Sequence, residues 1–400
     1  MQQWPGEVDL ASEHLGLISI CIPTYNRPDL LKIAVESCFV QKHRPLEILI
    51  GDDSRSDSAA LMLRSLQCPE GVSLKYVHNV PSLGQSANVN ALFARASGAR
   101  LALLHDDDLF CPDGLAALID GWRSAPDTVC VFGRQVGLTH GGVIDVANTV
   151  YLDHMYDRDV LEPGPQPSPV TVGLLQQLPN NCFLVDSGLA RRTSYRSERD
   201  VGQAVDADFG IRLGLNAGNA SFVFVRHFVS AYRRTAQSIA QSADRIQDHH
   251  LIYRKIDELP VPAADEAAKM TFLRRIGPSS VLDAANSGEG QLARAIMRSP
   301  HFGKSALSPH SLIAAVSIAW PRLGRKIRPV LKQIGKVGQT ASVSRQTRQL
   351  LASNHRSDPA PSGKDNPDDL ALMSRIEQRM GSLGWIRTDS DLRQGMKAAT

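Results

Sequence analysis

The sequence predicts an α/β protein whose first half builds a mostly parallel, doubly wound sheet. Short apolar runs alternate with helix-like segments through roughly the first quarter of the chain, a pattern that places a parallel sheet between layers of helices. Acid-rich turns follow the strand-like runs at 46–50 and 101–104. We expect both turns at the carboxyl-terminal edge of the sheet, where folds of this class bind ligands.

The elements follow in order along the chain. The apolar run at 17–22, ended by Pro23, predicts a central strand, and Pro28 then opens a helix to about residue 40. Further strands are expected at 46–50, 74–77, 101–104, 129–132 and 222–225, and further helices at 57–66, 86–96, 112–122 and 206–215. Residues 151–170, rich in Pro and Gly, are expected to form a loop over the ligand site.

The pattern changes along the chain and divides it into four parts. Residues 1–16 form an N-terminal extension, 17–240 the α/β domain and 241–350 a helical, basic region. Residues 351–400 are expected to be a linker and flexible tail, with one short amphipathic helix near 370–380.

Length and composition are those of a globular protein. The chain has 400 residues, 42% of them hydrophobic and 21% charged, with a formal net charge of +3. Its six cysteines form no C-x-x-C pair and no zinc spacing, which favours a reducing, cytoplasmic compartment. Residues 1–16 lack the apolar run of a signal peptide, and no stretch of about 20 apolar residues is present to span a membrane.

Basic residues gather near the carboxyl end. Residues 290–357 contain twelve Lys or Arg and no Asp or Glu. Within them, 311–336 joins a short apolar run to a dense cationic cluster, which suits either a helix lying on an anionic membrane or an ordinary helix with a solvated basic face. Few aromatic residues interleave with the cations, so nucleic acid is not an expected partner.

The most informative segment is the acid triplet at 106–108, directly behind an apolar run. Three adjacent carboxylates repel one another, and a divalent cation among them relieves that repulsion. A solvated acidic turn is the alternative. The polar turns at 23–28 and 51–57 end on the same sheet edge and favour a site. No G-x-G-x-x-G or G-x-x-x-x-G-K-[ST] sequence is present, which argues against a dinucleotide fold or a P-loop.

Four segments together give the chain a family resemblance. They are Pro-Thr-Tyr-Asn-Arg at 23–27, Asp-Asp-Ser-Arg-Ser-Asp at 52–57, Gly-Gln-Ser-Ala-Asn-Val-Asn at 84–90 and Leu-His-Asp-Asp-Asp-Leu at 104–109. In these segments, over roughly residues 17–238, the sequence resembles the family 2 glycosyltransferases. These enzymes have the GT-A fold and transfer sugars from nucleotide diphosphates.

The resemblance implies a set of site residues and a cofactor. The metal would be Mn²⁺ or Mg²⁺, held by Asp107 and Asp108. The donor-binding residues would be Pro23, Thr24, Tyr25, Asn26, Arg27, Asp52, Asp53, Asn88, Asn90, Asp106 and Arg233. Thr24 and the Pro23 backbone would help to bind the base, and Asp53 would accept a hydrogen bond from its ring N–H.

The chain departs from the family pattern at three positions. His105 stands where a D-x-D motif has its first acid, Val89 replaces a frequent arginine, and Thr235 stands where a Tyr-Arg-x-His stretch has its histidine. Arg233 and Arg234 remain as cations that could contact a diphosphate.

The general base implied by the resemblance is Asp206, within a segment at 205–213 similar to E-D-x-D-L-W-L-R-L. Asp206 could instead cap the helix that follows it, and Asp208 is the second candidate for the base. One base and one displacement at the anomeric carbon predict inversion.

The resemblance implies an inverting hexosyltransferase. It would use a UDP-sugar donor and a hydroxyl of a glycan or lipid-linked acceptor, in the setting of bacterial surface polysaccharide assembly at the inner face of the plasma membrane. Two other interpretations of the sequence remain open. A nucleotidyltransferase also uses paired carboxylates, although residues 23–28 lack the Gly-rich loop and Lys usual after its first strand. A non-catalytic binding protein that retains the fold gains weight from Val89 and Thr235.

Overall fold

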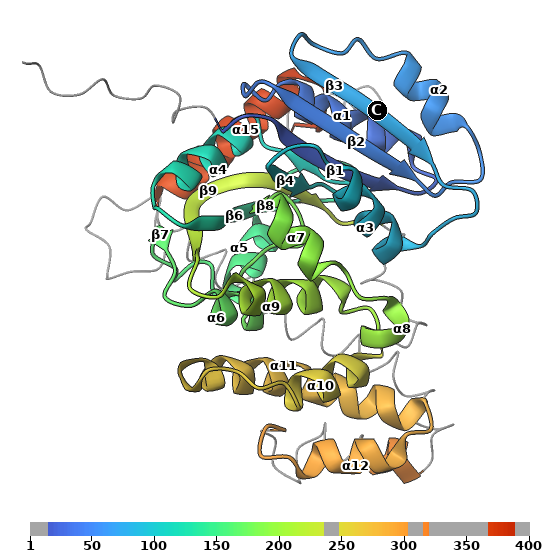
Figure 1. The fold of residues 1–400 in the computed structure, drawn as a ribbon, viewed down its shortest axis with the longest axis vertical. Coiled ribbons are helices and arrows are strands. Elements are labelled where there is room, and N and C mark those ends of the chain that lie inside the picture. Colours follow the sequence, from blue (N-terminus) through green and yellow to red (C-terminus); the bar gives the residue numbers. More distant parts are fainter. Residues whose placement is uncertain (1–14, 236–247, 303–314, 320–366, 389–400) are drawn as a thin grey trace, which may run out of the picture.

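A computed structural model describes residues 15–235, 248–302, 315–319 and 367–388 (Figure 1). Most of the N-terminal extension and the first part of the predicted linker lie outside these residues. The proposed membrane-binding segment at 311–336 also lies outside them, except for 315–319.

The first half of the sheet is parallel. Its strands are β1 (Ile18–Thr24), β2 (Leu46–Asp52), β3 (Val72–His78) and β4 (Arg100–Leu103), in the spatial order β3-β2-β1-β4. Helices α1 (Pro28–Phe39), α2 (Ser58–Arg64) and α3 (Gln85–Arg95) alternate with them. These elements confirm the predicted order of strands and helices.

Strand register brings the predicted turns to one edge. Thr24 lies opposite Asp52, and Asp52 lies opposite His78. Cys21 lies opposite Leu103, so the acid triplet after β4 runs level with the turn after β1. The carboxyl ends of these strands therefore form one edge, as a parallel sheet requires.

The second half of the sheet is mixed. Strand β8 (Leu184–Asp186) is antiparallel to β4 and to β6 (Thr128–Leu138), whereas β6 and β9 (Ser221–Arg233) are parallel. The short strands β5 (Leu109–Phe110) and β7 (Gly164–Pro165) pair antiparallel with β9. The expected parallel pairing thus holds for the first four strands. The spacing of apolar residues carries no information on strand direction, so it could not predict the mixed pairing of the later strands.

Helices cover both faces of the sheet. Successive residues of a strand point to opposite faces, so Ile20 and Ile22 pack under α1, α2 and α4 (Gly114–Arg123), while Cys21 packs on the other side. That other face carries α3, α6 (Pro169–Leu174), α7 (Ser187–Thr193) and α9 (Val205–Ala217). The two apolar layers hold the ligand edge rigid between them.

The segment expected to be a loop at 151–170 is partly helical. Helix α5 (Val146–Met155) covers its first five residues, and the carboxylate of Asp145 caps this helix by accepting from the Asn148 amide at 2.9 Å. The loop proper starts after Met155, where Pro and Gly accumulate, and it ends at α6.

The described part of the region predicted to be helical, residues 248–302, contains helices and no strand. It comprises α10 (His249–Asp257), the 3-10 turn η3 (Ala263–Asp265), α11 (Glu266–Asn286) and α12 (Gly290–Arg298). Figure 1 shows α10 and α11 below α9 and α6, with α12 farther from the sheet. A short helix α8 (Glu198–Val201) lies between α7 and α9 in sequence. No described helix has the length and apolarity needed to cross a bilayer.

The expectation of a flexible tail fails for residues 367–388. They contain helix α15 (Pro367–Ser382), which confirms the amphipathic helix expected near 370–380 and extends it at both ends. Its apolar face packs on the far end of the sheet with Leu109, Cys111, Val136, Leu138, Phe228, Ala231, Met373, Ile376, Met380, Trp385 and Ile386 in one buried cluster. Burial of this face stabilises a segment whose polar composition alone predicted a tail.

Polar contacts fix the position of α15. Both terminal nitrogens of Arg134 donate to the carboxylate of Asp369, at 2.7 and 2.8 Å, a bidentate geometry that is stronger than a single contact. Arg379 pairs with Asp113 at the start of α4, and the Arg387 amide donates to the Gly142 carbonyl at 2.8 Å.

We predict that Met380→Ala lowers the free energy of unfolding by about 2–5 kcal/mol, because it leaves a cavity in a packed cluster. Met380 is fully buried, whereas Leu383 in the next turn is 44% exposed, so Leu383→Ala should change stability by less than about 0.5 kcal/mol. Urea unfolding of the two variants measures the difference. Equal stabilities would mean that α15 does not pack on the sheet in solution.

Candidate active site

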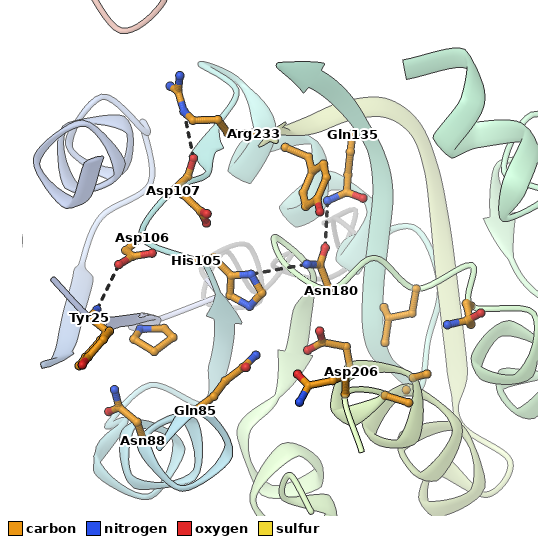
Figure 2. Close-up of a pocket in the computed structure, with 18 of the residues that line it drawn as sticks. Tyr25, Gln85, Asn88, His105, Asp106, Asp107, Gln135, Asn180, Asp206 and Arg233 are labelled. Atoms are coloured by element: carbon orange, nitrogen blue, oxygen red, sulfur yellow. Dashed lines mark hydrogen bonds between the residues drawn. The ribbon is translucent and has the colours of Figure 1, made fainter. Parts of the chain in front are cut away.

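A cavity of about 1100 Å³ opens at the carboxyl edge of the sheet (Figure 2). Its walls come from the loops after β1, β2 and β4, from α3 and α9, and from α10 and α11. Ligand sites usually measure about 300–1000 Å³, so this cavity has room for more than one drug-sized molecule.

Asp106 holds the turn after β1 in place. Its carboxylate accepts from the Thr24 hydroxyl at 2.8 Å, from the Tyr25 amide at 3.3 Å and from Arg27 Nη1 at 3.1 Å. Burial, and then the charge of Asp107, raise the pKa of Asp106, while Arg27 and the hydrogen bonds lower it. Asp106 therefore shapes the site by positioning the Pro23–Arg27 turn.

Asp108 is buried beside Asp107 and is not among the residues that line the cavity. Its carboxylate accepts from the Arg233 backbone amide at 2.8 Å and from the Asn181 side-chain amide. Burial raises the pKa of Asp108, and the neighbouring Asp107 raises it further. Asp108 thus ties the acid loop to β9, the strand that carries Arg233.

Asp107 faces the cavity between these two anchored residues. It accepts from Arg27 Nη1 at 2.8 Å and from the Thr235 hydroxyl at 3.4 Å. One ligand atom each from His105, Asp107 and Asp108 lies within 4.8 Å of the others. An imidazole and two carboxylates are suitable donors for a divalent first-row cation, so these residues fit the metal that the resemblance implies.

The surroundings of Thr235 show which side chain could supply an imidazole in place of the histidine of the family pattern. Thr235 lies beside Asp107, where the family pattern has a histidine, and its hydroxyl only donates a long hydrogen bond. His105 supplies an imidazole from the other side of the acid loop. The sequence placed His105 at the first position of the D-x-D motif, as in a familiar L-H-D-D-D variant, and the geometry now makes it a candidate ligand.

The loop after β2 closes one end of the cavity. The Asp53 carboxylate accepts from the Asn79 side chain at 2.9 Å and from the amides of Leu83 and Gly84 at 3.1 and 2.9 Å. Asn88 on α3 donates to the Gly51 carbonyl at 2.8 Å. Both Asp53 and Asn88 line the cavity, together with the Pro23–Arg27 turn.

Two residues of the predicted donor site do not line the cavity. Asp52 is fully buried and accepts from the Ser54 amide and the Tyr76 hydroxyl, each at 2.8 Å. Asn90 pairs with the backbone of Tyr195 through both ends of its amide, at 2.8 and 2.6 Å. Both residues support the walls from behind: Asp52 precedes Asp53, and Asn90 lies two residues after Asn88, and both Asp53 and Asn88 line the cavity.

Asp206 lies in the first turn of α9 and lines the cavity, with His105 among the lining residues as well. It does not cap its helix, since the N-cap position is Ala204 and no side chain caps it. One carboxylate oxygen, Oδ1, is buried without a hydrogen-bond partner among the described residues. Burial raises the pKa of Asp206, which His105 and a hydrogen bond with Tyr195 lower in part.

Asp208, the second candidate for the base, is occupied elsewhere. Its buried carboxylate pairs with Arg196 at 3.2 Å and Arg212 at 2.7 Å, and it does not line the cavity. Of the two acids, only Asp206 is placed to meet a ligand.

Arg233 and Arg234, at the end of β9, have different partners. Arg233 lines the cavity, and its Nε donates to the Asp107 carbonyl at 3.2 Å. Arg234 instead pairs with Asp145 at 2.7 Å, on the outer side. Arg233 is therefore the cation of this pair that a bound anion could reach.

Several lining residues carried no sequence signal. They come from segments without a motif, and include Gln135, Tyr156, Arg158, Gln176, Asn180, His249 and Phe272. Figure 2 shows Gln135 beside Asn180, and Asn180 reaching toward His105. These residues meet only through folding, because β6, the α5–α6 connection and α10–α11 are far apart along the chain.

Comparison with known proteins finds glycosyltransferases similar to part of the chain. Residues 19–163 match the model of the family described as glycosyl transferase family 2. An uncharacterized glycosyltransferase of Nostoc sp. is 30% identical over 176 residues, which are 44% of this chain and 50% of that protein. The GalNAc(5)-diNAcBac-PP-undecaprenol beta-1,3-glucosyltransferase of Campylobacter jejuni is 30% identical over 102 residues, 26% of this chain and 33% of that enzyme. The chain thus matches half or less of the length of these two relatives.

The fold agrees with this assignment. A solved structure of S. aureus TarS 1–349 in complex with UDP-GlcNAc superposes with a TM-score of 0.52 at 14% identity, over 80% of this chain and 92% of that one. The architecture is that of the GT-A glycosyltransferases. The match to the glycosyl transferase family 2 model lies within this fold, over residues 19–163.

Proposed function

We propose that the chain is an inverting glycosyltransferase that moves a hexose from a nucleotide diphosphate to a hydroxyl of a glycan or lipid-linked acceptor. The observation that carries this proposal is the unpartnered carboxylate oxygen of Asp206 in the cavity that also holds Asp107 and His105. A buried acceptor oxygen without a partner is costly for a structural residue and suits a group that receives a proton.

Asp206 is the general base of this proposal. Burial raises its pKa, which increases its basicity. The Tyr195 hydrogen bond orients the carboxylate, and the ring of Tyr195 stacks on Phe209 at 4.3 Å. Attack of the acceptor oxygen from the side of Asp206 inverts the anomeric carbon.

The donor diphosphate would lie against Arg27 and Arg233, near Asp107. A divalent cation bound there supplies charge that stabilises the departing nucleotide, and Asp107 with His105 and Asp108 would hold it. An imidazole among the donors favours Mn²⁺ over Mg²⁺, which prefers oxygen ligands.

The nucleobase would lie at the end of the cavity closed by Asp53. An ionised carboxylate accepts about four hydrogen bonds, and Asp53 receives three from the loop between β3 and α3. The remaining position suits the ring N–H of uracil, so we propose a UDP-sugar as the donor. The name of the Campylobacter relative specifies an undecaprenol-linked acceptor, and a lipid-linked acceptor is our proposal here.

We expect Asp206→Asn to lower turnover about 10²–10⁴-fold, the range that a general base contributes, while UDP binding changes less than twofold. Asp200→Asn on α8 is the matched control and should keep full turnover. Nucleotide release from UDP-sugars and UDP titration by calorimetry measure the two effects. Undiminished turnover in Asp206→Asn would remove Asp206 from this role.

The rate should also depend on the protonation of Asp206. The base acts when ionised, so kcat/KM falls as pH drops through its pKa, at a pH above the ordinary aspartate value of about 4. Tyr195→Phe removes the hydrogen bond that lowers this pKa and should move the acid limb to higher pH. Tyr253→Phe, which alters a buried tyrosine outside the cavity lining, should leave the limb in place. An unshifted limb in Tyr195→Phe would contradict the assignment.

The metal proposal predicts weaker Mn²⁺ binding in Asp107→Asn and in His105→Gln, by about tenfold or more in each, since even outer-shell partners contribute 10–100-fold. Calorimetry or electron paramagnetic resonance of Mn²⁺ in the presence of UDP measures this. Asp57→Asn, an exposed acid in the loop after β2, serves as the control. Unchanged affinity in both site variants would refute the metal site.

A further inference from the structure

The part of the cavity away from the nucleobase end contains an unusual buried cation. Arg158 lines the cavity but is only 2% exposed. Its Nε donates to the Gln177 carbonyl at 2.8 Å, and its Nη1 donates to the Gln135 side-chain oxygen at 3.2 Å. The wall around it includes Leu152, Tyr156, Gln176, Leu178, Phe272 and Ile276.

No described carboxylate forms an ion pair with Arg158. The nearest acid that acts on it is Asp153, and this carboxylate is bound to Arg134 at 2.8 Å, which in turn holds Asp369. Burial lowers the pKa of the Arg158 guanidinium, but an arginine stays charged at physiological pH. The hydrogen bonds of Arg158 go only to neutral oxygens. A buried charge in such surroundings is costly unless an anion binds to it.

A second arginine, Arg275, lies close to Arg158 but outside the cavity lining. The guanidinium of Arg158 lies 5.0 Å from the centre of the Tyr156 ring, and that of Arg275 lies 6.0 Å from the same centre. Arg275 pairs with Asp157 on its outer side and does not line the cavity. Arg158 is therefore the cation that a ligand in the cavity could meet.

Arg158 is also connected to the reaction centre. Gln135, which accepts from Arg158, donates to the Asn180 side chain at 3.3 Å, and Asn180 lies 3.5 Å from His105 Nδ1 (Figure 2). Gln135 also donates to Asn181 at 2.9 Å, and Asn181 donates to Asp108. These amides hold Arg158 at a fixed place relative to the acids, on the side of the cavity away from Asp53.

We propose that Arg158 forms an anion subsite for the acceptor, so that the acceptor sugar carries a carboxylate or phosphate group. This inference rests on the proposed function and narrows its acceptor class. The planar guanidinium suits such groups because it can donate two parallel hydrogen bonds. The Gln176 amide, which also lines the cavity, is a neutral partner for the rest of the sugar.

The test compares neutral and anionic sugars on the full chain with UDP and Mn²⁺ present, so that the nucleotide end is occupied. Glucose, glucose 6-phosphate and glucuronate are titrated by ligand-observed NMR. We expect at least one anionic sugar to bind more tightly than glucose. Arg158→Gln should weaken that sugar about tenfold or more, the effect of a charge-assisted hydrogen bond, and change glucose binding less than twofold.

Two variants control for charge and for folding. Arg275→Gln removes the same charge from the same neighbourhood outside the cavity and should leave both affinities within twofold. Arg158→Lys keeps the charge without the planar fork, so it should retain a weakened preference for the anionic sugar. If Arg158→Gln does not fold, as judged by UDP binding and circular dichroism, the lysine variant decides: a preference equal to that of the wild type overturns the proposal.

The other outcomes separate this inference from the function it rests on. No anion preference in the UDP-bound wild type overturns the subsite alone, whereas failure to bind UDP overturns the proposed donor. Equal weakening of neutral and anionic sugars in Arg158→Gln assigns Arg158 a structural role. A preference for UDP-glucuronate over UDP-glucose that depends on Arg158 would place the anion on the donor and also overturn the proposal.

Discussion

Mutual repulsion among three consecutive carboxylates is the constraint around which this site is arranged. The fold satisfies it by turning each acid toward a different partner. Asp106 holds the turn after β1, Asp108 holds the backbone of β9, and Asp107 lies between them and faces the cavity beside Arg27. Asp106 and Asp108 join the parallel and mixed halves of the sheet at the point where the cavity opens.

The local sequence was sufficient to predict the parallel half of the sheet and the residues at its carboxyl edge. Apolar runs between turn residues located β1 to β4, and strand register then required the turns at 23–27 and the acid triplet to meet. Sequence could not tell which neighbour of a functional residue faces inward. Asp52 and Asp53 are adjacent, as are Val89 and Asn90, and only packing decides that Asp53 faces the cavity and Asn90 does not.

The remaining features depend on contacts between distant segments. His105 gains its place as a candidate ligand from the fold around Asp107, which sequence comparison could not supply. Arg158 lies in a Pro- and Gly-rich stretch without a motif, and its burial depends on β6 and α11. Helix α15 has an amphipathic pattern that sequence detects, but its partner surface on β5, β6 and β9 is assembled from residues more than 100 positions away.

That docked helix sets a practical boundary for dissecting the protein. A shortened chain that stops at the end of the sheet, near residue 235, would contain every acid of the triplet and Asp206. It would also leave Leu109, Val136 and Phe228 open to water beside the loop that carries those acids. Exposed apolar surface of this kind promotes self-association. A fragment that stays soluble and keeps the fold would therefore have to retain residues 367–388, even if residues between 235 and 367 are removed.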